Sequence, residues 1–204
     1  GKAVSRTAES EILTGQALNA GKQALLGYVA QYAARTDHDV PGRLPCPEPL
    51  SPPAASEGVA ASLTCNDNTA TYVGRLPWRT LGIAQLRDGD GEPLWYVLGP
   101  GFRGSPINPD TPGQLMLDGI PNAAVALVIA PGSAINSLPD PNTPPAGCGK
   151  RNQSGNRFTL PYNPLDFLEC GNATGAYVTS GTSFASGNTT WINDHAIAIS
   201  AAEV

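Results

Sequence analysis

The chain has 204 residues, of which 14% are charged, and its formal net charge at pH 7 is -5. This length is enough for one domain with a sizeable core. An acidic chain without a Lys/Arg cluster lacks the concentrated positive charge that nucleic-acid binding requires, so we expect no nucleic-acid partner. The longest apolar run, AAVALVIA at residues 123–130, is shorter than the roughly 20 residues that cross a bilayer.

The first predicted element is an amphipathic helix, which we assign to residues 1–36. The segment 3–35 contains no Pro and is rich in Ala, Gln, Glu and Leu. Its apolar residues recur at the spacing of one helix face, which comprises Ala8, Ile12, Leu18, Leu25, Val29 and Tyr32. Three interior glycines, Gly15, Gly21 and Gly27, each weaken the helix by roughly 1 kcal/mol relative to Ala. We therefore expect the helix to depend on packing.

Residues 37–204 are expected to form a globular head of short strands and long loops. Most of the 23 Gly and 20 Pro residues fall in this part of the chain, and they favour turns. Strands are predicted at PLWYVLG (93–99), at the continuous apolar run AAVALVIAPG (123–132) and at the alternating HAIAIS (195–200). One long helix followed by strands predicts an α+β fold, in which a small antiparallel sheet packs on the helix.

The four cysteines are Cys46, Cys65, Cys148 and Cys170. Zinc sites normally use closely spaced cysteine pairs, which this chain lacks, whereas an even count fits two disulfides and an oxidising compartment. Three pairings are compatible with the sequence. We favour Cys46–Cys65 and Cys148–Cys170, because each closes a loop of about 20 residues and would stabilise the fold by roughly 3 kcal/mol.

The stretch LRDGDGEPLWYV (86–97) places Asp88, Asp90 and Glu92 close together and then becomes apolar. An EF-hand loop beginning at Asp88 would need Gly at its sixth position and Glu at its twelfth, where the chain has Pro93 and Gly99. Asp-Gly before an apolar run is a strong turn signal. We therefore predict a hairpin-type turn with solvated carboxylates, and a calcium site at these three residues is the minority interpretation.

Catalytic motifs are weak. SGTSFAS (180–186) resembles the surroundings of a nucleophilic serine, which would be Ser183, but the supporting base and carboxylate are missing. His38 is the only histidine upstream of Ser183, and His195 opens an apolar strand beside Asp194. We predict that the protein is not an enzyme and requires no cofactor, with calcium the one ion left open.

Six sequence blocks follow the helix, and they are GRLPCPEP (42–49), GRLPWRTLGI (74–83), DGDGEPLWYVL (88–98), VIAPG (128–132), FLECGN (167–172) and INDHAIAIS (192–200). In order and spacing they resemble the successive blocks of bacterial prepilin-like proteins, a group related to minor type IV pilins and to the pseudopilins of type II secretion. The resemblance implies a pilin-like α+β fold with long disulfide-tied loops and a structural rather than a catalytic role.

In that family the N-terminal helix continues upstream into a membrane-spanning half. The resemblance therefore implies a head lacking this half, located at the bacterial inner membrane and periplasm or in a cell-surface filament. Its partners would be other pilin or pseudopilin subunits. The helix would place one side on the sheet and the other against neighbouring subunits, through Ile12, Leu18, Leu25, Val29 and Tyr32. Interior glycines would allow close helix approach.

Two further expectations come with the resemblance. Related major pseudopilins bind calcium near the C-terminus, and the corresponding region here, 166–194, offers Asp166, Glu169 and Asp194 without a clear ligand set. The alternative function is a filament-tip module that recognises a surface or a secreted substrate, in which Trp78, Trp95 and Trp191 would stack on a ligand. Large aromatic residues dominate protein cores, so we expect buried packing instead.

Overall fold

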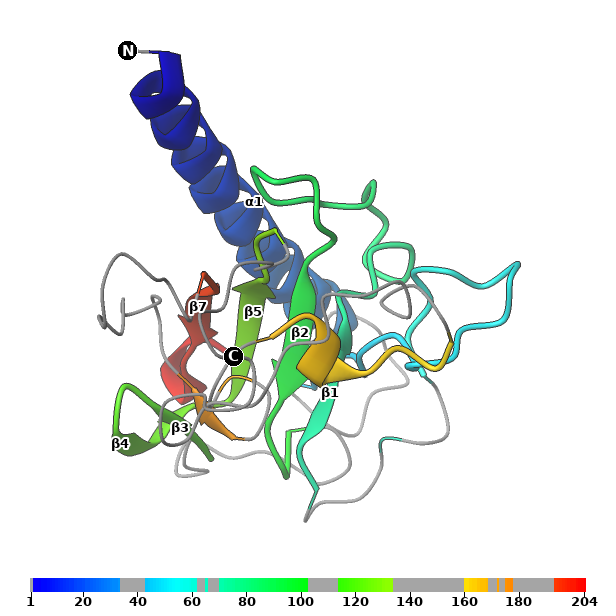
Figure 1. The fold of residues 1–204 in the computed structure, drawn as a ribbon. Helices are drawn as coiled ribbons and strands as arrows, with labels where there is room; N and C mark the ends of the chain where they lie inside the picture. Colours follow the sequence, from blue (N-terminus) through cyan, green and yellow to red (C-terminus); the bar gives the residue numbers. More distant parts are fainter. Residues whose placement is uncertain are drawn as a thin grey trace.

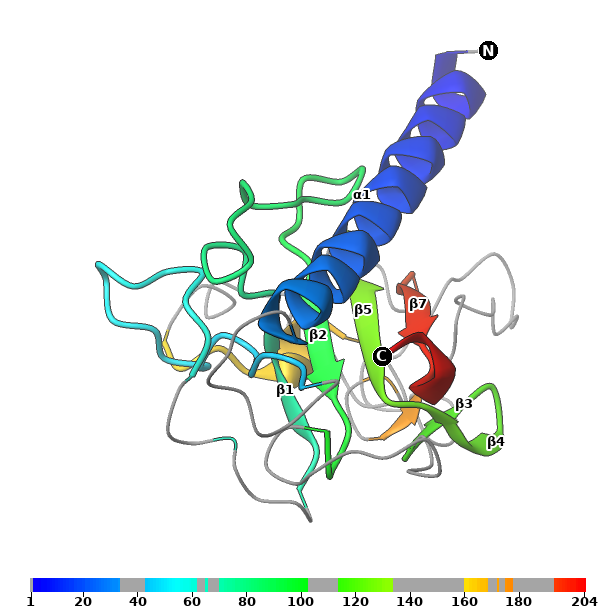
Figure 2. The ribbon, with the colours of Figure 1, turned by 180° about the vertical axis from the view of Figure 1, so that it is seen from behind.

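The computed structural model describes residues 2–33, 43–61, 65, 70–102, 114–133, 160–168, 172, 175–177 and 193–204. Its longest element is helix α1, Lys2–Ala33, which lies across the head and extends past it at the N-terminal end (Figure 1; Figure 2, from behind). Within the described part of the chain, no helix combines the length and the apolar character that a membrane crossing needs.

The main sheet has four strands in the order β1-β2-β5-β7, and every neighbouring pair is antiparallel. Its strands are β1 (Tyr72–Arg75), β2 (Trp95–Leu98), β5 (Ala126–Ala130) and β7 (His195–Ile199). A smaller sheet, in the order β4-β3-β6, consists of β3 (Leu115–Leu117), β4 (Ile120–Ala124) and β6 (Ala176–Tyr177), with β3 and β6 parallel. Two short 3-10 helices, Pro164–Asp166 and Ala201–Glu203, complete the described elements.

The α+β prediction is confirmed, as are the strands predicted at 93–99 and 195–200. The apolar run 123–132 contains a fully buried strand as expected, but it is shared between the end of β4 and the whole of β5. Strands β1, β3 and β6 were not predicted, because each has only two to four residues and therefore shows little periodicity.

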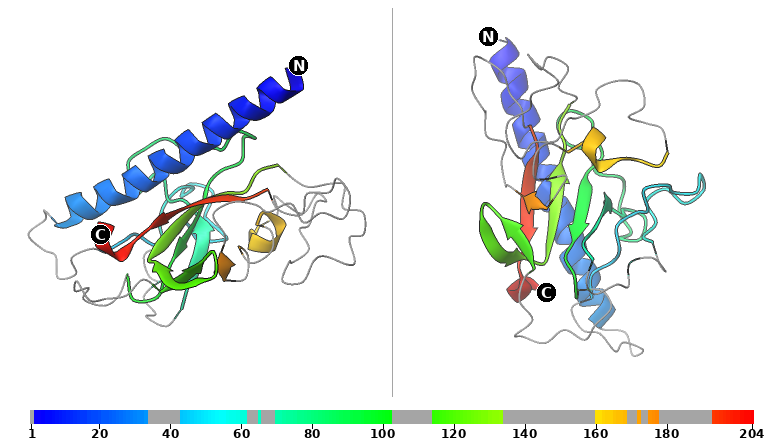
Figure 3. Two further views of the ribbon diagram at one scale, coloured as in Figure 1. Left: turned by 90° about the vertical axis from the view of Figure 1, so that its left-hand side faces the viewer. Right: turned by 60° about the horizontal axis from the view of Figure 1, so that its bottom comes forward.

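The central strands of the main sheet, β2 and β5, are buried on both faces. Leu18, Leu25 and Val29 of α1 pack on the face that carries Leu94 and Tyr96. Tyr96 is therefore the β2 residue on the helix side in this contact. On the opposite face, Trp95 and Val97 pack with Phe167, Leu115 and Tyr177, so the helix and the smaller sheet lie on opposite sides of the main sheet (Figure 3).

Gly21 explains how closely the helix approaches the sheet. A Cβ at this position would lie 3.2 Å from Cγ1 of Val128 on β5, whereas a Cβ at Gly15 or Gly27 would meet nothing within 4 Å. One interior glycine is therefore used for packing on the sheet, while Gly15 and Gly27 are exposed positions with open space around them.

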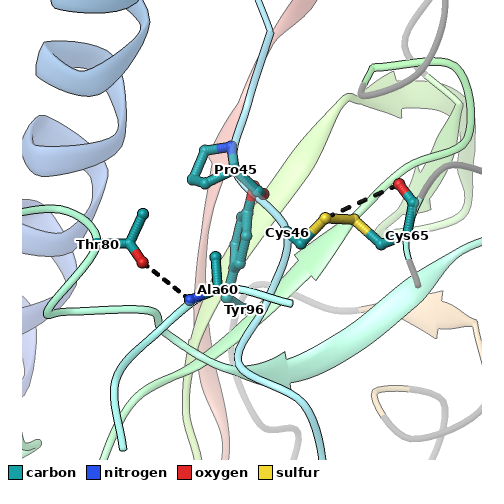
Figure 4. Close-up of a disulfide and its surroundings, with 6 residues drawn as sticks. All are labelled: Pro45, Cys46, Ala60, Cys65, Thr80 and Tyr96. Carbon is teal, nitrogen blue, oxygen red and sulfur yellow. Dashed lines mark hydrogen bonds between the residues drawn. A yellow bond between two sulfur atoms is a disulfide. The ribbon is translucent and has the colours of Figure 1, made fainter. Parts of the chain in front are cut away.

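The segment 43–61 runs beside β1, where the Glu48 N–H donates to the Arg75 carbonyl at 3.0 Å, and a disulfide joins its Cys46 to Cys65 (Figure 4). The Tyr96 hydroxyl donates a hydrogen bond to the Pro45 carbonyl at 2.9 Å, and the Ala60 N–H donates to Oγ1 of Thr80 at 2.8 Å. The predicted Cys46–Cys65 pairing is thus confirmed. Cys148 and Cys170 lie outside the described residues.

Candidate functional site

The acidic stretch forms the predicted turn. The Asp88 N–H donates to the Glu92 carbonyl at 2.9 Å, and the Gly91 N–H donates to the Asp88 carbonyl at 3.0 Å. Arg87 and Pro93 form an isolated antiparallel bridge at its base. The turn therefore leads directly into the buried residues Leu94–Leu98, as the sequence indicated.

The expectation that all three carboxylates are solvated is wrong for Asp88, which is 5% exposed. Its Oδ1 accepts hydrogen bonds from the N–H groups of Asp90 at 3.0 Å and Glu92 at 2.9 Å, and its Oδ2 accepts one from the Gly132 N–H at 2.8 Å. Burial raises the pKa of this carboxyl, while these hydrogen bonds oppose the rise and the charge of Asp90 adds to it. Asp88 thus fastens the turn to the end of β5.

The same turn also contacts the helix. The Gly89 N–H donates to Oγ1 of Thr14 at 2.9 Å, and the Ser10 hydroxyl donates to Oδ1 of Asp90 at 3.4 Å. A Cβ at Gly89 would overlap the Ser10 carbonyl oxygen, so only glycine allows this approach. Oδ2 of Asp90 accepts from the Ser133 N–H at 3.3 Å, which links the turn to the residues after β5.

These contacts border a cleft of about 670 Å³ between the N-terminal half of α1, the turn and the adjacent ends of β5 and β7. This volume lies within the range of ligand-binding pockets, roughly 300–1,000 Å³. The described lining residues include no Lys or Arg. The full set of described lining residues is Ser10, Glu11, Thr14, Gly15, Leu18, Asp88, Asp90, Ala130, Gly132, Asn193 and His195. The cleft is therefore an oxygen-rich site beneath the helix.

The three residues of the minority calcium interpretation are not arranged as one ligand set. Both oxygens of Asp88 accept backbone N–H groups, and Glu92 does not line the cleft. Among the described residues, no group of three or more His, Cys, Asp or Glu side chains is placed to hold a metal ion. The second calcium candidate was the C-terminal region 166–194. There, Asp194 is buried and accepts a hydrogen bond from Nδ2 of Asn172 at 3.2 Å, while Glu169 lies outside the described residues.

The predicted assembly residues fall on different sides of α1. Leu18, Leu25 and Val29 are buried against the sheet, whereas Ile12 is 59% exposed and its neighbour Leu13, which the apolar pattern did not include, is 53% exposed. The side chain of Tyr32 lies outside the described part of the structure.

The remaining candidates are three tryptophans, one serine and two histidines. Trp95 is fully buried, with its ring centroid 5.1 Å from that of Phe167, so it is a core residue. Trp78 is half-buried against Gly58, and Trp191, Ser183 and His38 lie outside the described residues. His195 is exposed at the start of β7, where it lines the cleft. Sequence reasoning did not predict this cleft.

The structure defines the class of this protein as α+β, one long helix on an antiparallel sheet. No protein-family model matches the chain, and neither a curated protein nor a solved structure matches it.

Proposed function

We propose that this protein is a non-enzymatic structural subunit of a type IV pilus or a type II secretion pseudopilus, and that it acts by filament assembly through α1. The observation that carries the proposal is the outward face of the helix. While one side of α1 is buried on the sheet, the side facing away from it is exposed and carries no charged residue from Ile12 to Gln31. Solvent-facing helix surfaces are normally rich in charged residues, so an uncharged one is suited to packing against other chains.

The spacing on this face supports helix–helix packing. Six of its exposed residues recur at alternating intervals of three and four, the spacing with which two helices form a continuous contact. We call this set the outward seam, and it consists of Leu13, Gln16, Ala20, Gln23, Gly27 and Ala30. Half of the set is Ala or Gly, which lets helix backbones come close together.

The blocks that resemble the prepilin-like proteins also contribute to the proposal. Residues 74–83 include the end of β1, residues 88–98 form the acidic turn and β2, and residues 192–200 include β7. They therefore build the sheet on which α1 packs, as a pilin-like head would require. The same resemblance implies attachment at the bacterial inner membrane and partnership with other pilin or pseudopilin subunits.

The test begins with deletion of the full-length gene, which should abolish filament formation or type II secretion. The deletion strain is then complemented with Leu13→Glu or Ile120→Glu. Both substitutions place a charge at an exposed apolar residue, 53% exposed on the outward seam and 61% exposed on β4. We expect Leu13→Glu to prevent assembly and Ile120→Glu to restore it, with equal melting temperatures of the two heads.

Sheared filaments and the secreted fraction are the measurements. An unchanged phenotype after gene deletion would overturn the proposed function. Full assembly with Leu13→Glu, or an equal defect with Ile120→Glu, would overturn the role of the outward seam.

A further inference from the structure

The cleft beneath α1 has a distinctive charge pattern. Glu11 and Asp90 lie exposed at its border, and Asp88 lies buried within it. The described lining residues include neither Lys nor Arg, and the imidazole of His195 is the one basic side chain among them. A carboxylate offers about four acceptor sites, and Asp90 uses two for Ser10 and Ser133. The site therefore retains capacity for a hydrogen-bond donor with positive charge.

The arrangement suits an elongated cation better than a compact one. A metal ion needs several ligands that converge on one point, and no such group of three occurs among the described residues. The carboxylates are instead spread around a cleft of about 670 Å³. Its lining also has an apolar part, since Leu18 and Ala130 are 7% and 1% exposed. Lys and Arg side chains combine an aliphatic stem with a charged end.

We propose that this cleft receives a basic side chain, Lys or Arg, from a neighbouring protein chain. The stem lies on Leu18 and Ala130, and the charged end donates to Glu11 and Asp90. Arg matches best, because its planar guanidinium can donate two parallel hydrogen bonds to one carboxylate. The cleft uses the side of α1 opposite the outward seam, so this inference goes beyond filament assembly and does not depend on it.

The test is a binding titration followed by backbone amide NMR. The probe is Nα-acetyl-arginine methylamide, and its neutral counterpart is Nα-acetyl-citrulline methylamide, which has nearly the same shape without the charge. We expect saturable shifts of the Gly89, Gly132 and His195 amides with the arginine probe, and affinity at least about tenfold weaker for the citrulline probe, since hydrogen bonds to charged groups are the stronger ones.

A pair of helix variants supplies the matched control. Glu9 and Glu11 are both exposed on α1 and two residues apart, but only Glu11 lines the cleft. Glu11→Gln should weaken binding of the arginine probe roughly tenfold, and Glu9→Gln should leave it unchanged. Equal responses to the two probes, no saturable shift with arginine, or equal effects of the two variants would overturn the proposal. So would shifts that appear with calcium chloride and not with the arginine probe.

Discussion

At the scale of single residues, the turn at 88–92 is held in place by the carboxylate of one residue, Asp88. Asp88 accepts two N–H groups from its own turn and one from Gly132, 44 residues away. A buried N–H without an acceptor costs about 1–3 kcal/mol. A single side chain therefore fixes the local turn and its place against β5, which brings Gly89 and Asp90 to the helix.

Two glycines should respond in opposite directions to the same substitution. Gly89→Ala places a Cβ against the Ser10 backbone, so the helix or the turn must move, and we expect a loss of about 1–3 kcal/mol of unfolding free energy. Gly27→Ala meets nothing within 4 Å on an exposed helix face, and should stabilise the head by about 1 kcal/mol. Urea denaturation measures both, and a neutral Gly89→Ala would contradict the close approach.

At the scale of secondary-structure elements, the sequence predicted what depends on local pattern. The apolar stripe with Leu18, Leu25 and Val29 predicted which face of α1 is buried. The continuous apolar run 123–132 predicted a strand buried on both faces. Ile12 lies six residues before Leu18, which at 3.6 residues per turn places it on a different side of the helix, and it is 59% exposed.

The cleft could not be predicted in this way. It is defined by contacts between residues far apart in the chain: Ser10 meets Asp90 across 80 positions, and Thr14 meets Gly89 across 75. Ser, Thr and Gly at single positions carry no periodic signal. The acidic residues were noticed, but the burial of Asp88 follows from the path of β5, which no local pattern reveals.

The disulfide gives a prediction for the segment beside β1. Replacing Cys46 and Cys65 together by Ala removes a cross-link between positions 19 apart, and we expect a loss of roughly 3 kcal/mol, chiefly through the greater freedom of the unfolded chain. Urea denaturation under oxidising conditions measures the loss. Mass mapping of the unreduced wild type is the companion experiment, and a peptide that links Cys46 to any other cysteine would contradict the structure.

At the scale of the whole molecule, buried carboxyls should make stability depend on pH. Glu48 is buried beneath the loop at Gly58, whose N–H donates to its carboxylate. Burial raises the pKa of Glu48 above 4.5, and the attraction of that N–H and of Arg75 offsets only part of the rise. Burial likewise raises the pKa of Asp88 above 3.8.

The sign follows from proton binding. Between the unfolded pKa and the raised folded pKa, the folded chain keeps a proton that the unfolded chain has lost, so the unfolding free energy falls as pH rises through this window. Glu48→Gln cannot titrate and should become more stable relative to the wild type as pH rises. Melting curves from about pH 4 to pH 7 measure this. Glu9→Gln neutralises an exposed carboxylate on α1 and should follow the wild type.

Glu203 acts in the opposite direction. Its hydrogen bond with Lys22 lowers its pKa, so its small contribution to the unfolding free energy is present above pH 4.5 and is lost as pH falls.

Parallel pH profiles for the wild type and Glu48→Gln would contradict the assignment of the main slope to Glu48.

The way α1 is fastened also has a mechanical consequence. Among the described contacts of the helix, those nearest its N-terminus are the hydrogen bonds of Ser10 with Asp90 and of Thr14 with Gly89. The close contact of Gly21 with Val128 and the ion pair of Lys22 with Glu203 at 2.8 Å follow further along. A pulling force applied at the N-terminal end of α1 therefore reaches the acidic turn before it reaches the core. The hydrogen bonds between the turn and the helix would break first, and the sheet behind them would stay folded.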